Sequence, residues 1–149
     1  MKLPLTGSAV PYSLPGAVPR DRDILVVDDS KVMREMIIAC LRGASNVRFT
    51  QAASGLEAIE HLSLRGFDAV LLDLNMPDIG GIEVVEFVRS QTQLRSLPIL
   101  VVTTRGDDAS RERVLAAGAS AYMTKPFTPE GLIAQVRVLL GEPDGVTVT

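Results

Sequence analysis

The sequence predicts an α/β fold in which a doubly wound parallel sheet of five strands carries helices on both faces. Short runs rich in Val, Ile and Leu are typical of strands buried on both faces of a parallel sheet. The clearest runs are 24–27, 69–72 and 99–102. Helical patterns separate the runs, so strand and helix alternate along the chain. Right-handed crossovers between parallel strands then place helices on both faces of the sheet.

Five strands and five helices follow from this alternation. We place the strands at 24–28, 47–52, 68–72, 99–103 and 120–124, and the helices at 31–42, 55–65, 82–91, 108–117 and 129–140. Ser30 and Ser54 are suitable N-caps, and Pro129 suits the first turn of the last helix. Turn-forming residues fill the loop at 75–81. Glycines follow four of the helices, at Gly43, Gly66, Gly118 and Gly141.

Apolar side chains at helical spacing predict which face of each helix packs on the sheet. In the first helix they are Val32, Met36, Ile37, Cys40 and Leu41, and in the second they are Leu56, Ile59 and Leu62. The last helix has more apolar positions than one buried face requires. Its surplus is compatible with an exposed seam for a partner or a second copy, so we expect a monomer or a weak homodimer.

The two ends of the chain differ in composition from the middle. Residues 1–22 hold four prolines and two glycines and show little periodicity, so we predict a flexible N-terminal extension. The predicted domain covers 23–141, and the tail at 142–149 is too short for a second domain.

Composition excludes several classes of function. The net charge is -3 with no basic block, which argues against a nucleic-acid partner. No apolar stretch approaches the ~20 residues needed to cross a bilayer, and prolines interrupt the apolar residues of the N-terminus, so neither a membrane span nor a signal peptide is expected. A single cysteine, Cys40, excludes an internal disulfide. A reducing cytoplasm is the predicted location.

Polar side chains follow the predicted strands where each apolar run stops. They are Asp28, Asp29, Asp73, Thr103 and Lys125. The carboxyl ends of the strands in an open parallel sheet meet at one edge, where ligands bind. The sequence therefore predicts that three carboxylates, a hydroxyl and an ammonium lie together there.

Three neighbouring carboxylates need a compensating cation, because their charges repel one another. Mg²⁺ prefers oxygen ligands, often one or two carboxylates together with phosphate oxygens. We expect Asp29 and Asp73 to be direct ligands, with Asp28 acting directly or through water. A main-chain carbonyl near Asn75 is a further candidate ligand. No Cys–His spacing indicates a zinc site.

The same residues suit phosphoryl transfer to a carboxylate, which forms an acyl phosphate. Asp73 follows what should be the central strand and has no acidic neighbour, so we assign the attack to it. Lys125 and Thr103 are expected to hold phosphoryl oxygens. Lys31 and Arg34 open the first helix near the acids and are interpreted as solvated charges.

The motifs resemble those of response-regulator receiver domains of bacterial two-component signalling, and the chain is similar to stand-alone, chemotaxis-type receivers. The resemblance covers 23–140. It is carried by Val26-Val27-Asp28-Asp29-Ser30, by Leu71 to Pro77 followed by Gly81, by Val101-Val102-Thr103, and by Gly118 through Tyr122 to Thr124-Lys125-Pro126-Phe127.

This resemblance implies a flavodoxin-like sheet with strand order 2-1-3-4-5. It implies that Asp73 accepts a phosphoryl group from a histidine kinase or phosphotransfer protein, with self-phosphorylation and self-dephosphorylation as the only chemistry. Thr103 and Tyr122 would be switch residues, and the Lys125–Pro126 peptide would be cis. Mg²⁺ would be held by the three aspartates and one carbonyl: Asp28, Asp29, Asp73 and the main chain of Asn75.

Two residues depart from the family pattern. Thr104 stands where receivers often carry Ala or Gly, and Arg105 is a long cation beside the expected route of an attacking water. Three alternatives stay open: a phosphate sink, a receiver fragment of a larger hybrid kinase, and a haloacid-dehalogenase-type phosphatase. The phosphatase class wants its nucleophile on the first strand and an acid two residues later, where this chain has Asn75.

Overall fold

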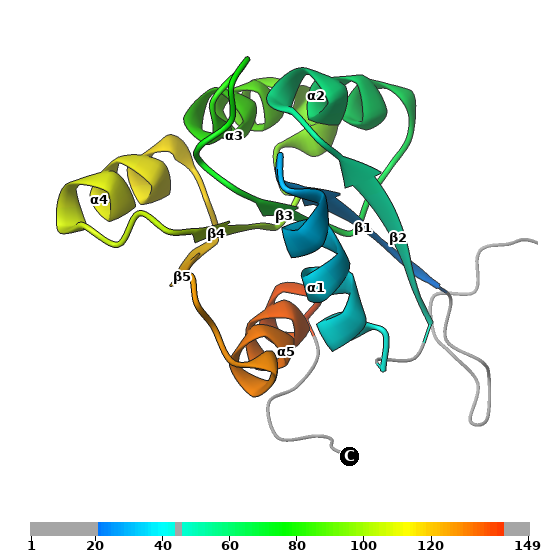
Figure 1. Cartoon of the computed structure of the whole chain (residues 1–149). Helices are drawn as coiled ribbons and strands as arrows, with labels where there is room; N and C mark the ends of the chain where they lie inside the picture. The colour runs from blue at the N-terminus through cyan, green and yellow to red at the C-terminus, as the bar shows by residue number, and fades with distance from the viewer. Residues whose placement is uncertain (1–20, 44–45, 142–149) are drawn as a thin grey trace, which may run out of the picture.

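The computed structural model describes residues 21–43 and 46–141, which form a five-stranded parallel sheet with helices on both faces (Figure 1). The strand order is β2-β1-β3-β4-β5, so the predicted fold class is confirmed. The strands are β1 (Arg22–Val27), β2 (Val47–Ala52), β3 (Ala69–Leu72), β4 (Ile99–Thr103) and β5 (Ala121–Thr124). The helices are α1 (Lys31–Leu41), α2 (Gly55–Leu64), α3 (Gly81–Ser90), the 3-10 helix η1 (Thr92–Leu94), α4 (Asp108–Ala117) and α5 (Pro129–Leu139).

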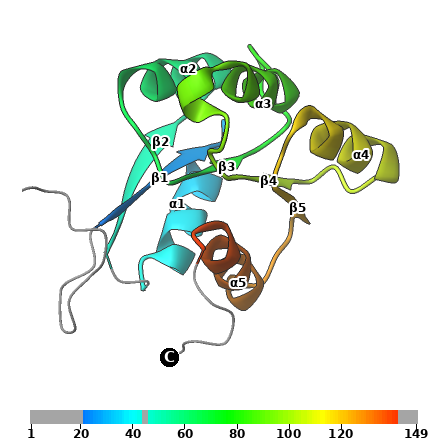
Figure 2. The ribbon, with the colours of Figure 1, turned by 180° about the vertical axis from the view of Figure 1, so that it is seen from behind.

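Helices cover both faces of the sheet (Figures 1 and 2), and a hydrophobic layer packs each face against them. One layer joins α2, α3 and α4 to the sheet, and the other joins α1 and α5 to the opposite face. The side chains of β1 alternate between the layers: Leu25 and Val27 enter the first, and Ile24 and Val26 enter the second. The central strands are therefore buried on both faces, which is why they read as continuous apolar runs.

The predicted boundaries agree with the structure to within one residue, except that β1 starts two residues earlier than predicted. Arg22 pairs with Val47 of β2, and its guanidinium donates to the carbonyl of Leu140 at 3.1 Å. Most of the predicted extension at 1–22, and the whole tail at 142–149, lie outside the described residues. The 3-10 helix η1 was not predicted.

The predicted inner face of α1 is partly wrong. Val32 and Met36 are 71% and 47% exposed, whereas Ile37, Ile38 and Leu41 are buried. Two apolar stripes run side by side along this helix, and periodicity alone does not choose between them. The stripe that meets β1 and the neighbouring α5 is the one that becomes buried.

Arg89 joins four parts of the fold near the amino-terminal ends of the strands, at the edge of the sheet opposite the polar residues that follow the strands. It lies in the last turn of α3, and burial lowers the pKa of its guanidinium. The acceptors of its hydrogen bonds are the carbonyls of Leu94, Arg95, Leu97 and Gly118 and the hydroxyl of Ser120. One side chain therefore ties α3 to η1, to the start of β4 and to the end of α4.

Replacing Arg89 with methionine is expected to destabilise the fold by about 2 kcal/mol, because several half-buried carbonyls lose their donor. Urea unfolding followed by circular dichroism measures the change. The exposed Arg111 of α4 gives a matched control, and Arg111→Met is expected to change stability by less than about 0.5 kcal/mol. Equal stability of the two variants would contradict this role of Arg89.

Candidate functional site

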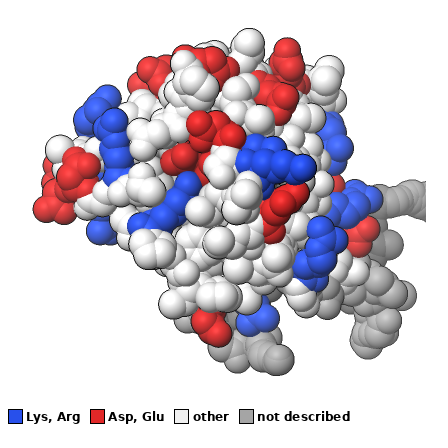
Figure 3. All heavy atoms as spheres, in the orientation of Figure 1, with Lys and Arg blue, Asp and Glu red and all other residues white. Residues whose placement is uncertain are grey.

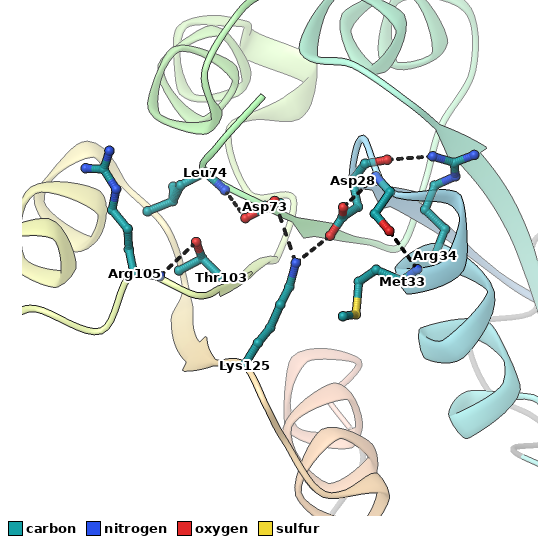
Figure 4. A network of polar contacts seen from close by, with 9 residues as sticks. Asp28, Met33, Arg34, Asp73, Leu74, Thr103, Arg105 and Lys125 are labelled. Atoms are coloured by element: carbon teal, nitrogen blue, oxygen red, sulfur yellow. Dashed lines mark hydrogen bonds and ion pairs between the residues drawn. The ribbon is translucent and has the colours of Figure 1, made fainter. Parts of the chain in front are cut away.

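The carboxyl edge of the sheet gathers the polar residues that follow the strands (Figure 4). Asp28 follows β1, Asp73 follows β3, Thr103 ends β4 and Lys125 follows β5. Thr103 is fully buried, and Asp28 and Asp73 are only 2% and 6% exposed. Asp29 is exposed at the rim. The structure thus brings together the residues that the sequence predicts for the site.

The donor set fits a divalent cation. One carboxylate oxygen from each of Asp28, Asp29 and Asp73 lies within 4.8 Å of the others. Three oxygen donors with an open side at Asp29 suit Mg²⁺, which keeps some of its waters and binds few carboxylates. When bound, the ion supplies positive charge that neutralises carboxylate and phosphoryl oxygens.

Lys125 reaches both buried carboxylates. Its ammonium lies 2.6 Å from Oδ2 of Asp28 and 3.6 Å from Oδ2 of Asp73, and its side chain is only 9% exposed. Figure 4 shows the side chain extending from the end of β5 to a point between the two acids. The peptide bond between Lys125 and Pro126 is cis.

Main-chain amides fix the other oxygens of the same two acids. Ser30 N–H donates to Oδ1 of Asp28 at 2.9 Å, and Leu74 N–H donates to Oδ1 of Asp73 at 2.8 Å. Each buried carboxylate therefore has one oxygen held by the backbone and one turned toward Lys125. This arrangement orients Asp73 Oδ2 toward the open centre of the site.

Asp78 anchors the loop that follows β3. Its carboxylate accepts hydrogen bonds from the first-turn amides of α2, at Gly55 (3.2 Å) and Leu56 (3.0 Å). The hydrogen bond from Leu56 is the main cause of the lowered pKa of Asp78. Because a Cβ on Gly55 would lie 2.3 Å from the carbonyl oxygen of Ile79, the close approach of loop and helix requires glycine there. The loop that carries Asn75 is thus tied to α2.

Burial raises the pKa of Asp73 above its ordinary value of 3.8. The charge of Lys125 opposes this shift, the charge of Asp28 adds to it, and hydrogen bonds from Thr103 and Asn75 lower the pKa. In the absence of a bound metal, the effect of burial on the pKa of Asp73 is therefore larger than the opposing effect of Lys125, Thr103 and Asn75. The site holds more negative charge than its own cation compensates.

Replacing Asp73 with asparagine is expected to raise the Tm at pH 7 in EDTA. Folding raises the pKa of this carboxyl, so the folded state binds its proton more tightly and stability falls as pH rises from 3.8 through the raised value. The difference in Tm between variant and wild type should therefore be larger at pH 7 than at pH 4. Thermal unfolding by circular dichroism measures it, and a lower Tm for the variant at pH 7 would contradict the expectation.

Thr103 and Tyr122 are joined through the main chain of Arg105. Arg105 N–H donates to Oγ1 of Thr103 at 3.3 Å, and the Tyr122 hydroxyl donates to the Arg105 carbonyl. The side chain of Arg105 points away from Asp73 (Figure 4), so it does not cover the carboxylate in this structure. The loop after β4 therefore connects the buried hydroxyl to the half-buried ring of Tyr122.

Sequence reasoning missed the contacts of Arg34. It was interpreted as a solvated charge, but its guanidinium donates to the main-chain carbonyl of Asp28 at 2.6 Å. Lys31 is exposed and, among the described residues, pairs with Glu35 at 3.8 Å, in agreement with the prediction. No motif signals the Arg34 contact, because a main-chain acceptor leaves no trace in the sequence.

Residues 24–137 match the response regulator receiver domain family, so the chain belongs to this family. It is 38% identical over 122 residues to the chemotaxis protein CheY1 of Helicobacter pylori, covering 81% of this chain and 98% of that protein. The structure of the chemotaxis response regulator CheY4 of Vibrio cholerae aligns with a TM-score of 0.75 at 35% identity, covering 80% and 99% of the two chains. Fold and relatives together define a CheY-like response regulator receiver domain.

A third relative is informative about metals. The receiver domain of sensor histidine kinase PA1611 from Pseudomonas aeruginosa has a magnesium ion coordinated in its active-site cleft. It aligns with a TM-score of 0.75 at 30% identity, covering 82% of this chain and 99% of that one. Receiver domains generally bind Mg²⁺ at an acidic pocket and are phosphoacceptors rather than conventional enzymes.

Every helix among the described residues is too short or too polar to span a bilayer.

Proposed function

We propose that this protein accepts a phosphoryl group on Asp73 from the phosphohistidine of a histidine kinase or phosphotransfer protein, in a Mg²⁺-dependent reaction. The position of the Lys125 ammonium, 3.6 Å from Asp73 and 2.6 Å from Asp28, carries the proposal. A buried cation beside a carboxylate of raised pKa suits a site that receives further negative charge. Phosphorylation then switches a protein-binding surface.

The proposed reaction is a single displacement. A carboxylate oxygen of Asp73 attacks phosphorus, the P–N bond to the donor imidazole breaks, and its electron pair stays on that nitrogen. Lys125 and the hydroxyl of Thr103 each hold one phosphoryl oxygen. Mg²⁺ would be held by Asp28, Asp29, Asp73 and the main-chain carbonyl of Asn75. Later, water attacks phosphorus, the bond to Asp73 breaks, and inorganic phosphate and a free carboxylate result.

The switch proposed for the downstream surface uses Thr103 and Tyr122. Thr103 moves toward the phosphoryl group and Tyr122 turns inward behind it, which alters the face formed by α4, β5 and α5. The hydrogen bonds of both side chains to the main chain of Arg105 support a shared movement. Physically, a local change of charge biases an element that has two arrangements.

Intact-protein mass spectrometry with a small acyl-phosphate donor tests the proposed function. Incubation with Mg²⁺ is expected to add one phosphoryl group, on a peptide that contains Asp73, and the group should be lost again in water. EDTA should prevent the addition. An adduct that forms equally well in EDTA, or that maps elsewhere, would contradict the proposal.

The remaining alternatives differ in partners. A receiver fragment of a hybrid kinase is favoured by the likeness to the receiver of the sensor kinase PA1611, and a phosphate sink would share the same site chemistry. A phosphotransfer profile against several kinases separates these from a regulator with its own target. Steady turnover of a phosphomonoester would instead indicate a haloacid-dehalogenase-type phosphatase. We further propose a cytoplasmic monomer or weak homodimer whose only reactions are self-phosphorylation and self-dephosphorylation.

A further inference from the structure

Arg34 bridges the first helix to the ends of two strands. Its Nη1 donates to the main-chain carbonyl of Asp28 at 2.6 Å, and its Nε donates to Oε1 of Gln51 in β2 at 2.8 Å (the first contact is drawn in Figure 4). Neither acceptor is a carboxylate, so these contacts do not neutralise the guanidinium. A half-buried arginine is thus directed at one peptide group rather than at a charge.

That peptide group lies between the two acids of the pair. The N–H of Asp28 donates to the carbonyl of Ala52 at 3.1 Å, which fixes the peptide before Asp28. The carbonyl of Asp28 lies beyond the last residue of β1, and Arg34 is its donor among the described residues. Because peptide groups are planar, holding both peptides fixes φ and ψ of Asp28. These two angles in turn set the direction of the Asp28 Cβ and the path of the chain at Asp29.

We propose that Arg34 is a positioning residue for the magnesium site, which it serves by fixing the peptide between Asp28 and Asp29. The inference rests on the proposed function. Arg34 has two opposing effects on a bound cation: it orients two ligands, which raises affinity, and it adds positive charge nearby, which lowers affinity. The short charge-assisted hydrogen bond and the second anchor at Gln51 make orientation the larger effect.

Isothermal titration of the unphosphorylated full chain with Mg²⁺ separates the two effects. Arg34→Met is expected to raise the Kd for Mg²⁺ about tenfold, as is typical when a residue that orients a metal ligand is lost. Arg34→Lys should raise it less than Arg34→Met, because a lysine ammonium can still donate to one acceptor, although it lacks the planar fork that holds both. Gln51→Met, which removes the second anchor alone, should also give a smaller rise.

Lys31→Met is the matched control, because Lys31 is a cation on the same turn that pairs with Glu35 at 3.8 Å and does not touch the Asp28 carbonyl. Its Kd should equal that of wild type or be slightly lower. If Arg34→Met binds Mg²⁺ as tightly as wild type or more tightly, charge alone is at work and the inference is wrong. Circular dichroism checks folding; if Arg34→Met does not fold, an unchanged Kd in both Arg34→Lys and Gln51→Met overturns the inference.

The wild-type titration distinguishes the two levels of the proposal. If wild type binds no Mg²⁺, both the proposed function and the role of Arg34 fail. If wild type binds Mg²⁺ and takes up phosphoryl while the Arg34 variants bind equally well, only the role of Arg34 fails.

Discussion

Replacing Asp73 with alanine is expected to abolish phosphoryl uptake from a small acyl phosphate, because alanine has no side-chain oxygen that could form the new bond to phosphorus. The neighbouring acids do not substitute for it. Oδ2 of Asp28 is paired with Lys125 at 2.6 Å, and Asp29 is exposed at the rim. Intact-protein mass spectrometry after incubation with Mg²⁺ and donor should show one added phosphoryl group on wild type and none on Asp73→Ala.

A matched control uses an exposed acid outside the site. Asp108 lies in the first turn of α4, and Asp108→Ala is expected to accept phosphoryl as fast as wild type. Undiminished labelling of Asp73→Ala would show that another residue is the acceptor. Loss of labelling in both variants would indicate an effect on folding, which circular dichroism detects.

Replacing Lys125 with methionine is expected to lower stability and reactivity together. The variant leaves Asp28 and Asp73 buried without their cation, and breaking a buried pair in this way costs about 3 kcal/mol. For a domain of this size such a loss corresponds to a fall in Tm of about 10 °C. Phosphoryl uptake should fall about 100-fold, because one donor to the developing charge is lost.

Magnesium should partly restore the stability of Lys125→Met, since the ion also compensates the carboxylates. The rise in Tm on adding Mg²⁺ is therefore expected to be larger for the variant than for wild type, which thermal unfolding with and without EDTA measures. Lys31→Met, a change at an exposed lysine that pairs with Glu35, should leave both quantities unchanged. A Lys125→Met protein as stable as wild type in EDTA would show that the two acids need no cation.

The fold was predictable because its strongest signals are local. The runs that became β1, β3 and β4 are buried on both faces, so their composition alone identifies them as strands of a parallel sheet. Helix faces were less predictable: Leu56 was expected to face inward and is 52% exposed, while Ala58, two positions further along the chain, is fully buried. A helix with apolar residues on adjacent stripes chooses its inner face through packing, which the sequence does not encode locally.

The residues of the site were predictable for a different reason. Each follows an apolar run, and the topology of a parallel sheet brings such positions to one edge. The supporting contacts were not predictable. Asp78 and Arg89 act on main-chain groups of distant segments, and those acceptors exist at every residue, so no side-chain pattern reveals them.

The hydrogen bonds of Arg89 make the two ends of α4 mechanically unequal. The helix buries only Ser110 and Val114 among its ten residues, so its packing against the sheet restrains it weakly. At its far end the carbonyl of Gly118 is pinned at 2.9 Å by a side chain that is itself anchored to three other carbonyls. A displacement of the loop after Thr103 is therefore expected to move the N-terminal end of α4 more than the end held at Gly118.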